Sequence, residues 1–305
     1  MRRDVSFDAD GNILRGWLYL PDRGASPFST IVMAHGFSAL KEMGLDDYAE
    51  VFCAAGLAVL VYDHPNLGAS DGFPRNEIDP IAQLRGYGHA VTFACRQPEL
   101  DTGRIGLWGT SYSGGLVLIA AAVDRRVKCV VSQVPYLSGY ENAMSTTAPE
   151  RMAELERQLQ AEQLALAAGQ PPTMVPVCTD DPSLPPDSPG RMSHRYFRHF
   201  ADARGLDWPN RVTLRSLALR LEYESLPYLP RIAPTPLLMI VAAEDRITPT
   251  QIALRAYASA LAPKKLVTIA GDHYRPYVEA FGESSAAARD WFVEHLCTVP
   301  KPTPA

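Results

Sequence analysis

The 305-residue sequence contains few cysteines, no excess of positive charge and no long apolar run. Its five cysteines are scattered, odd in number and without a Cys-x-x-Cys pair. We therefore expect reduced thiols, most of them buried, and neither a disulfide framework nor a metal site. A net charge of −5 argues against nucleic-acid binding. Because the apolar runs are too short to span a bilayer and none follows the N-terminus, the sequence predicts a cytoplasmic protein without a membrane anchor.

Apolar runs alternate with helical patterns over residues 1–134 and again over residues 231–297. Such alternation predicts an α/β fold with a mostly parallel central sheet flanked by helices on both faces. Residues 5–7 and 13–20 surround a cluster of turn-forming residues, which predicts an initial β-hairpin. Further strands are predicted at residues 30–34, 57–62, 105–108, 127–132, 236–242 and 266–269.

This alternation is interrupted between residues 135 and 230, where the sequence shows no clear strand. Helical periodicity and helix-terminating residues predict helices at 149–168, 191–203 and 212–223. Because the strand–helix alternation resumes afterwards, we interpret residues 135–230 as a helical cap inserted before the penultimate strand. Residues 298–305 are rich in proline and are predicted to form a flexible tail.

A glycine- and serine-rich turn joins the predicted strand 105–108 to an apolar helix, and Ser111 lies at its centre. A serine at such a strand–turn–helix bend directs its hydroxyl away from the sheet, and the next backbone N–H points to where an oxyanion would form. Gly109 provides the small residue that must precede the serine. Ser113 replaces the second glycine of the usual Gly-x-Ser-x-Gly motif. The pattern predicts Ser111 as a nucleophile.

A serine nucleophile needs a base and an acid that orients the base. Asp245 follows the predicted strand 236–242, and His273 follows the strand 266–269. Both therefore lie at the carboxyl ends of strands, where open α/β sheets place their sites, in the chain order serine, acid, histidine. Glu244 stays open as an alternative acid, and Glu141 is a more distant one. The other six histidines lack such a placement.

The oxyanion of a serine mechanism needs two hydrogen-bond donors. One is predicted to be the backbone N–H of Tyr112, directly after the nucleophile. The other should come from the loop after the strand 30–34, and we nominate the backbone N–H of Phe37.

Taken together, five features make the chain resemble the α/β-hydrolase superfamily. These features are His35-Gly36, the loop from Asp63 to Gly72, the turn around Ser111, Asp245 and His273. Residues 33–36, Lys41-Glu42 and 107–115 are similar to the dienelactone-hydrolase-like branch, which includes polyketide transferases of natural-product pathways. The resemblance implies a serine hydrolase or acyltransferase that cleaves an ester or thioester through an acyl-serine intermediate. No cofactor is implied, and coenzyme A or an acyl carrier protein is a candidate partner.

Two other functional classes stay open at this point. The first is a non-hydrolytic enzyme that performs elimination, cyclisation or C–C bond cleavage in the same pocket, since a fold does not fix a function. The second is a binding protein built on an inactive hydrolase scaffold, although the complete set of serine, acid and histidine argues against it. Lys41 and Glu42 are either a functional pair near the mouth of the pocket or a surface ion pair, and we leave them out of the predicted site.

The predicted helix over residues 191–203 should have an aromatic face and a basic face. Met192, Tyr196 and Phe200 fall on the first face and should pack inward. The second face carries a basic stripe of five residues: Arg191, His194, Arg195, Arg198 and His199. This stripe is either solvated or paired with acidic residues such as Glu154 and Glu156, or it binds the phosphate of coenzyme A or of a carrier protein's phosphopantetheine arm.

Overall fold

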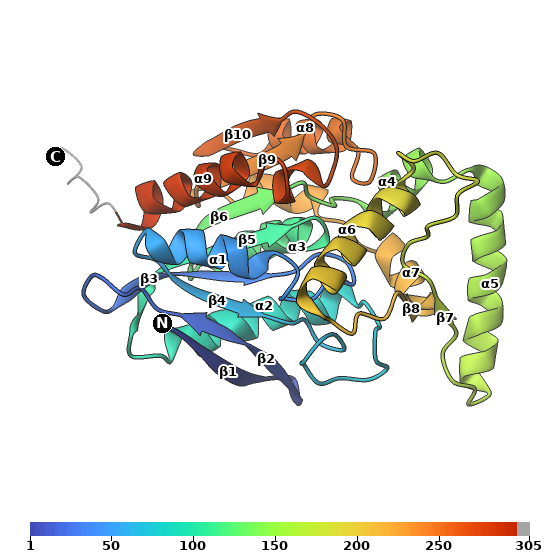
Figure 1. The fold of residues 1–305 in the computed structure, drawn as a ribbon, viewed down its shortest axis with the longest axis horizontal. Coiled ribbons are helices and arrows are strands. Elements are labelled where there is room, and N and C mark those ends of the chain that lie inside the picture. Colours follow the sequence, from blue (N-terminus) through green and yellow to red (C-terminus); the bar gives the residue numbers. More distant parts are fainter. Residues whose placement is uncertain (298–305) are drawn as a thin grey trace.

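The computed structural model describes residues 1–297 and contains a central eight-stranded sheet between two layers of helices (Figure 1). The strand order is β1-β2-β4-β3-β5-β6-β9-β10. The hairpin strands β1 and β2 are antiparallel to each other, β2 is antiparallel to β4, and the other neighbours are parallel. The strands span Arg2–Ala9 (β1), Asn12–Tyr19 (β2), Phe28–Ala34 (β3), Ala58–Tyr62 (β4), Leu100–Thr110 (β5), Val127–Gln133 (β6), Leu237–Ala242 (β9) and Lys264–Ile269 (β10). The predicted fold class is confirmed, whereas the predicted tail at 298–305 lies outside the described residues.

Helices cover both faces of the sheet, which explains why its inner strands read as continuous apolar runs. One face packs against α2 (Pro80–Cys95), α3 (Tyr112–Val123) and α8 (Thr250–Ser259). The other face packs against α1 (Leu45–Ala54) and α9 (Phe281–Phe292), which continues as a short π-helical turn, Val293–Cys297. Every residue of β4 is buried as a result, and so are nearly all residues of α3.

Between β6 and β9 the chain leaves the sheet and forms mainly helices (Figure 1). They are α4 (Gly139–Thr146), α5 (Pro149–Ala167), α6 (Pro189–Arg204), α7 (Leu214–Leu221) and the 3-10 helix η1 (Leu226–Arg231). Two short strands, β7 (Met174–Val175) and β8 (Val212–Thr213), pair in an antiparallel ladder. The sequence did not predict this ladder, because two-residue strands have too few positions to show a period.

Helix α6 attaches this segment to the loop that follows β3. Met192, Tyr196 and Phe200 are buried as predicted. Tyr196 and Phe200 belong to a cluster with residues of the 39–43 loop and with Trp208. The indole N–H of Trp208 donates to the Ser38 carbonyl at 2.7 Å. Helix α5 is attached more weakly, since its apolar side chains Met152, Leu155, Leu159 and Leu166 are only half-buried.

The five cysteines are all free, as the sequence predicts. The prediction that most of them are buried is wrong, because only Cys129 and Cys178 are. Cys53 and Cys95 lie near the ends of α1 and α2 and are half-buried, while Cys297 is exposed.

Candidate active site

Ser111 occupies the sharp turn between β5 and α3. Its backbone has φ 53° and ψ −117°, a conformation that costs energy in a non-glycine residue and that clusters at functional sites. Hydrogen bonds hold it there: Ser111 N–H donates to the Gln133 carbonyl, and Tyr136 N–H donates to the Ser111 carbonyl, each at 2.9 Å. Glycine is required at position 109, since a Cβ there would lie 2.3 Å from the Ser113 carbonyl oxygen.

The structure brings Ser111, His273 and Asp245 together in one hydrogen-bonded series. His273 Nε2 lies 3.1 Å from Ser111 Oγ, and His273 Nδ1 lies 2.6 Å from Asp245 Oδ2. The histidine and the carboxylate are both buried. Of the alternative acids, Glu244 is exposed, and Glu141 forms an ion pair with Arg255. The geometry therefore favours Asp245 as the orienting acid.

Asp245 is itself held by the turn that follows β9. Its Oδ1 accepts hydrogen bonds from the backbone N–H groups of Ile247 (2.8 Å) and Thr248 (2.7 Å). The Thr248 hydroxyl also lies 2.8 Å from Asp245 Oδ2. These contacts fix the carboxylate against the imidazole, so that the histidine tautomer with hydrogen on Nδ1 is favoured.

The backbone around Phe37 approaches Ser111 closely. A Cβ at Gly36 would lie 3.1 Å from Ser111 Cβ, so the loop after β3 passes directly beside the nucleophile. Tyr112 is the first residue of α3, and its N–H therefore has no acceptor within the helix. The Phe37 and Tyr112 rings pack edge to face with centroids 5.4 Å apart. This arrangement places both predicted oxyanion-hole residues next to Ser111.

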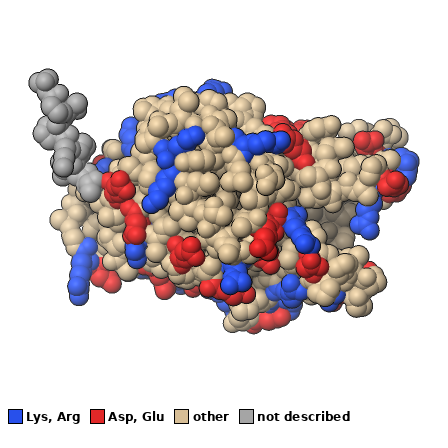
Figure 2. Space-filling view, turned by 90° about the horizontal axis from the view of Figure 1, so that it is seen from above, with Lys and Arg blue, Asp and Glu red and all other residues tan. Residues whose placement is uncertain are grey.

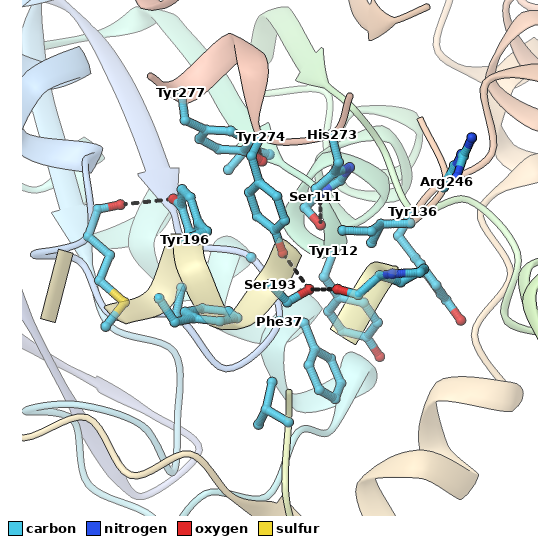
Figure 3. A pocket seen from close by; sticks show the side chains of 18 of the residues that line it. Phe37, Ser111, Tyr112, Tyr136, Ser193, Tyr196, Arg246, His273, Tyr274 and Tyr277 are labelled. Carbon is cyan, nitrogen blue, oxygen red and sulfur yellow. Dashed lines mark hydrogen bonds between the residues drawn. The ribbon is translucent and has the colours of Figure 1, made fainter. Parts of the chain in front are cut away.

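A pocket of about 220 Å³ opens in front of Ser111 (Figure 3). Its wall is rich in aromatic side chains; those of Tyr136, Tyr196, Phe197, Tyr274 and Tyr277 contribute to it. Helix α6 closes one side, because the Tyr274 hydroxyl donates to Ser193 Oγ at 2.8 Å and the Tyr274 and Tyr196 rings stack at 4.4 Å. The sequence did not identify the residues of α6 that line this pocket.

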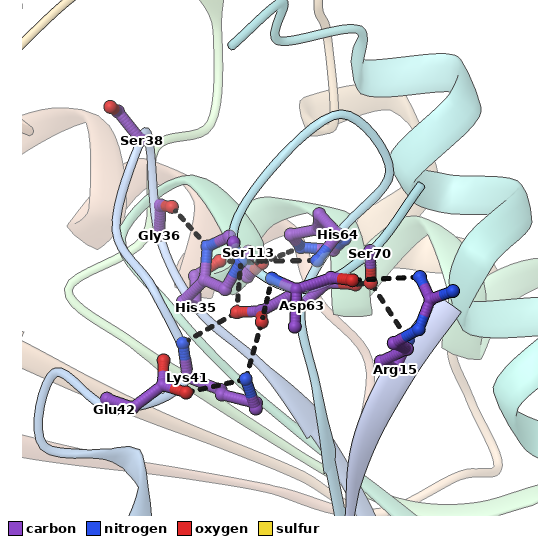
Figure 4. A network of polar contacts seen from close by, with 12 residues as sticks. Arg15, His35, Gly36, Ser38, Lys41, Glu42, Asp63, His64, Ser70 and Ser113 are labelled. Atoms are coloured by element: carbon purple, nitrogen blue, oxygen red, sulfur yellow. Dashed lines mark hydrogen bonds and ion pairs between the residues drawn. The ribbon is translucent and has the colours of Figure 1, made fainter. Parts of the chain in front are cut away.

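A buried polar network lies behind the nucleophile and connects β3, β4 and α3 (Figure 4). His35 Nδ1–H donates to the Gly36 carbonyl at 2.9 Å, and His35 Nε2 accepts the His64 N–H at 3.2 Å. His64 Nε2–H donates to Ser113 Oγ at 2.8 Å, and the Ser113 hydroxyl donates to the His35 carbonyl at 2.5 Å. Burial lowers the pKa of His35 and lowers that of His64 still further, so both imidazoles are neutral near pH 7.

Lys41 extends this network and corrects one prediction. Its ammonium donates to Asp63 Oδ2 at 2.7 Å and to Glu42 Oε1 at 2.6 Å, and its backbone N–H donates to Asp63 Oδ1 at 2.8 Å. Burial acts to lower the pKa of Lys41, but the two carboxylates outweigh it and raise that pKa. Lys41 and Glu42 do form an ion pair, but its predicted place at the surface is wrong, since Lys41 is buried. Nothing in the local sequence indicates that the loop 37–43 is covered by α6.

The basic stripe on α6 faces outward, with Arg195, Arg198 and His199 exposed. Arg191 and Arg195 donate to the carbonyls of Leu184 and Pro186, and Arg198 pairs with Asp202 of its own helix. Of the alternatives left open for the stripe, pairing with Glu154 is not found, because Glu154 pairs with Arg157 on α5, whereas the exposure of three stripe residues agrees with a solvated face.

Acidic and basic side chains are interspersed on the face shown in Figure 2. Over residues 1–297, no helix is both long and apolar enough to cross a membrane. The same residues contain no group of three or more His, Cys, Asp or Glu side chains placed to hold a metal ion.

Comparison with known proteins agrees with the fold and the site. Residues 10–177 match the family described as X-Pro dipeptidyl-peptidase (S15 family). The chain belongs to this family and to the α/β-hydrolase superfamily. It is therefore an enzyme of the α/β-hydrolase type, a hydrolase or an acyltransferase.

Individual relatives cover most of the chain. The thiohydrolase aneE of Aspergillus aculeatus is 34% identical over 263 residues, which are 84% of this chain and 81% of the relative. The polyketide transferase grgF of a Penicillium species is 30% identical over 283 residues, 92% of each chain. A crystal structure of the α/β hydrolase GrgF from Penicillium sp. sh18 superimposes with a TM-score of 0.83 at 28% identity, covering 98% of this chain and all of that one.

Proposed function

We propose that this enzyme cleaves an ester or thioester through an acyl-Ser111 intermediate. The observation that carries the proposal is the hydrogen-bonded series from Ser111 through His273 to Asp245, which opens on an aromatic-lined pocket. A nucleophile, a base and an orienting acid in this arrangement form the constellation of serine acyl transfer.

In the proposed reaction, Ser111 Oγ attacks the carbonyl carbon of the substrate while His273 Nε2 takes the hydroxyl proton. Asp245 stabilises the resulting imidazolium. The backbone N–H groups of Phe37 and Tyr112 donate to the oxyanion of the tetrahedral intermediate. When the intermediate collapses, the C–O or C–S bond breaks and His273 protonates the leaving alcohol or thiol. Water or another acceptor then releases the acyl group by the same steps in reverse.

Residues 135–230 act as a helical cap in this proposal and form one side of the acyl pocket. The contacts of α6 with Tyr274, next to the base, support this role. The names of the relatives favour a thioester over an ester and a natural-product, polyketide-type pathway. An acyl group bound to coenzyme A or to an acyl carrier protein is then the expected donor.

Ser111→Ala tests this function with a simple acyl thioester as substrate. The variant should keep its thermal unfolding midpoint and lose roughly 10⁴-fold or more in turnover. Mass spectrometry of wild-type protein treated with a fluorophosphonate should find the adduct on the peptide that contains Ser111. Ser145→Ala, which changes an exposed serine of α4, is the matched control and should behave like wild type. Turnover by Ser111→Ala within tenfold of wild type would refute the proposal.

A further inference from the structure

Arg220, near the end of α7, lines the pocket in front of Ser111. Its side chain forms no ion pair within residues 1–297, and its guanidinium carbon lies 5.7 Å from the centre of the Phe37 ring. Arg246 also lines the pocket but is paired with Asp187 at 2.5 Å. Arg220 thus places a positive charge that forms no ion pair within the described residues on the wall of the pocket.

Three polar atoms in this part of the wall are buried without a hydrogen-bond partner. They are Arg220 Nε and the hydroxyl oxygens of Tyr112 and Tyr136. Tyr112 is 1% exposed and Tyr136 is 6% exposed, and their ring centroids are 5.4 Å apart. Burial raises the pKa of both tyrosines, while the Arg220 cation opposes that rise in each. Both hydroxyls therefore stay protonated and can donate.

Leaving such groups unpaired is costly. An unsatisfied buried donor costs on the order of 1–3 kcal/mol, and the great majority of buried polar groups in native proteins have a partner. The guanidinium has only donors, and the two hydroxyls can add two more. A set of donors around one cation complements an anionic oxygen group better than any neutral group.

We propose that Arg220, with the hydroxyls of Tyr112 and Tyr136, forms a subsite for an anionic oxygen group of the carboxylate class on the acyl chain of the substrate. This inference rests on the proposed function, because the subsite lies in the pocket of Ser111, and it narrows the substrate to acyl groups that carry a negative charge. The Tyr112 backbone N–H donates to the oxyanion of the tetrahedral intermediate, whereas the Tyr112 hydroxyl donates to the distal carboxylate of the acyl chain.

The test compares two series of N-acetylcysteamine thioesters. One series carries straight-chain dicarboxylic acids of four to eight carbons, linked through one carboxyl group, and the other carries the same acyl groups with the distal carboxylate capped as a methyl ester. The readout is the ratio of kcat/KM for the charged member to that for the capped member. Wild type should favour the charged member at one chain length, and that length reports the span from Ser111 to Arg220.

Arg220→Gln should reduce this preference at least about tenfold, because a charge-assisted hydrogen bond is lost. Arg220→Lys should keep part of it, since lysine retains the charge but not the fork of donors. Arg255→Gln is the matched control, because Arg255 is exposed, paired with Glu141 and outside the pocket. If Arg220→Gln does not fold, Arg220→Lys still tests the proposal. A preference for the charged thioester as large in Arg220→Lys as in wild type would contradict the proposal.

Three results overturn the inference. The first is that wild type shows no preference for the charged thioester at any chain length. The second is that Arg220→Gln lowers kcat/KM for the charged and the capped thioester alike, which would mean that Arg220 only supports Phe37. The third is that Arg246→Gln removes the preference instead, which would place the anion at the paired arginine.

Binding to Ser111→Ala protein, measured by calorimetry, separates this inference from the proposed function. There Arg220→Gln should weaken the affinity for the charged thioester at least about tenfold. If the fluorophosphonate does not label Ser111 but this loss is observed, the proposed reaction fails and the subsite stands. If Ser111 is labelled and the loss is absent, the subsite alone is wrong.

Discussion

Two buried polar regions flank Ser111 and satisfy their hydrogen-bonding groups in different ways. The support side, formed by His35, Lys41, Asp63, His64 and Ser113, finds its partners within the protein, apart from His64 Nδ1. The pocket side, formed by Tyr112, Tyr136 and Arg220, leaves three buried polar atoms without partners.

Both regions lost contact with water on folding, and only partners offset that loss. The support side has them and can therefore hold β3, β4 and α3 in a fixed relation behind the nucleophile. The pocket side lacks them, so its polar groups are available to a ligand. A buried polar group next to a site can therefore support the structure or be available to a ligand. Whether it has hydrogen-bond partners within the protein distinguishes the two roles.

The largest effect is expected at Asp245, whose carboxylate orients the imidazole of His273. In Asp245→Asn an amide replaces the acceptor that fixes the histidine tautomer, and turnover should fall roughly 10⁴-fold. Glu244→Gln is the adjacent control and should stay within about twofold, because Glu244 is exposed. Steady-state kinetics on both variants provides the measurement. Similar losses in the two variants would show that the acid is wrongly assigned.

Lys41→Met should break the support side. It leaves the Asp63 carboxylate buried without its cation, and removing one partner of a buried ion pair costs about 3–5 kcal/mol of unfolding free energy. Arg3→Met removes one partner of the more exposed pair with Glu99 and should cost about 1 kcal/mol or less. Urea unfolding of both variants measures the difference. Equal costs would mean that the network does not act as a buried structural unit.

The support side should also make stability depend on pH. Burial depresses the pKa values of His35 and His64 in the folded state, whereas an unfolded histidine titrates near 6.5. Below about pH 6.5 the unfolded chain binds protons that the folded chain does not bind, so stability is complete above this pH and falls as the pH decreases. Each histidine contributes a slope of up to about 1.4 kcal/mol per pH unit.

Urea unfolding at pH 7, 6 and 5 measures this slope, and His64→Gln should reduce it. His89→Gln is the control, since His89 is paired with Asp10 outside the support side and its replacement leaves His35 and His64 in place. An identical slope in wild type and His64→Gln would show that His64 is not the group that resists protonation.

The sequence predicted the sheet and the candidate site from different kinds of signal. Buried strands such as β4 contain only apolar residues, and these runs located the strands well. The edge strand β10 begins two residues earlier than predicted, because Lys264 and Lys265 have no apolar signal. Helix α4 was not predicted, since it begins at a glycine and depends on the Ser138 side chain, which accepts the Glu141 N–H at 3.0 Å.

Ser111, Asp245 and His273 were predicted because the chain order of the site is fixed by the topology of the sheet. The burial of Lys41 beside Asp63 and the position of Arg220 in the pocket were missed for the opposite reason. The partner of Lys41 lies 22 residues away, on a neighbouring strand end, and no local pattern shows that both groups are buried. In the sequence, Arg220 has the pattern of a charged residue on the polar side of an amphipathic helix. Its place in the pocket is shown only by its position over the Phe37 ring in the structure.

The smallest effect is expected on the pocket side, at Tyr136→Phe. Removing a hydroxyl that has no partner removes no hydrogen bond, so the unfolding free energy should stay within about 0.5 kcal/mol of wild type or rise slightly. Tyr48→Phe is the matched comparison, because its equally buried hydroxyl donates to the Pro276 carbonyl at 2.8 Å and lies 2.7 Å from Ser284 Oγ. That change removes these hydrogen bonds, together with the one that Gln133 Nε2 donates to the Tyr48 hydroxyl at 3.1 Å, and should cost about 1–3 kcal/mol. Urea unfolding of the two variants under the same conditions gives both values. If Tyr136→Phe were as destabilising as Tyr48→Phe, the Tyr136 hydroxyl would have a partner in the free enzyme, and the distinction between the two sides of Ser111 would not hold.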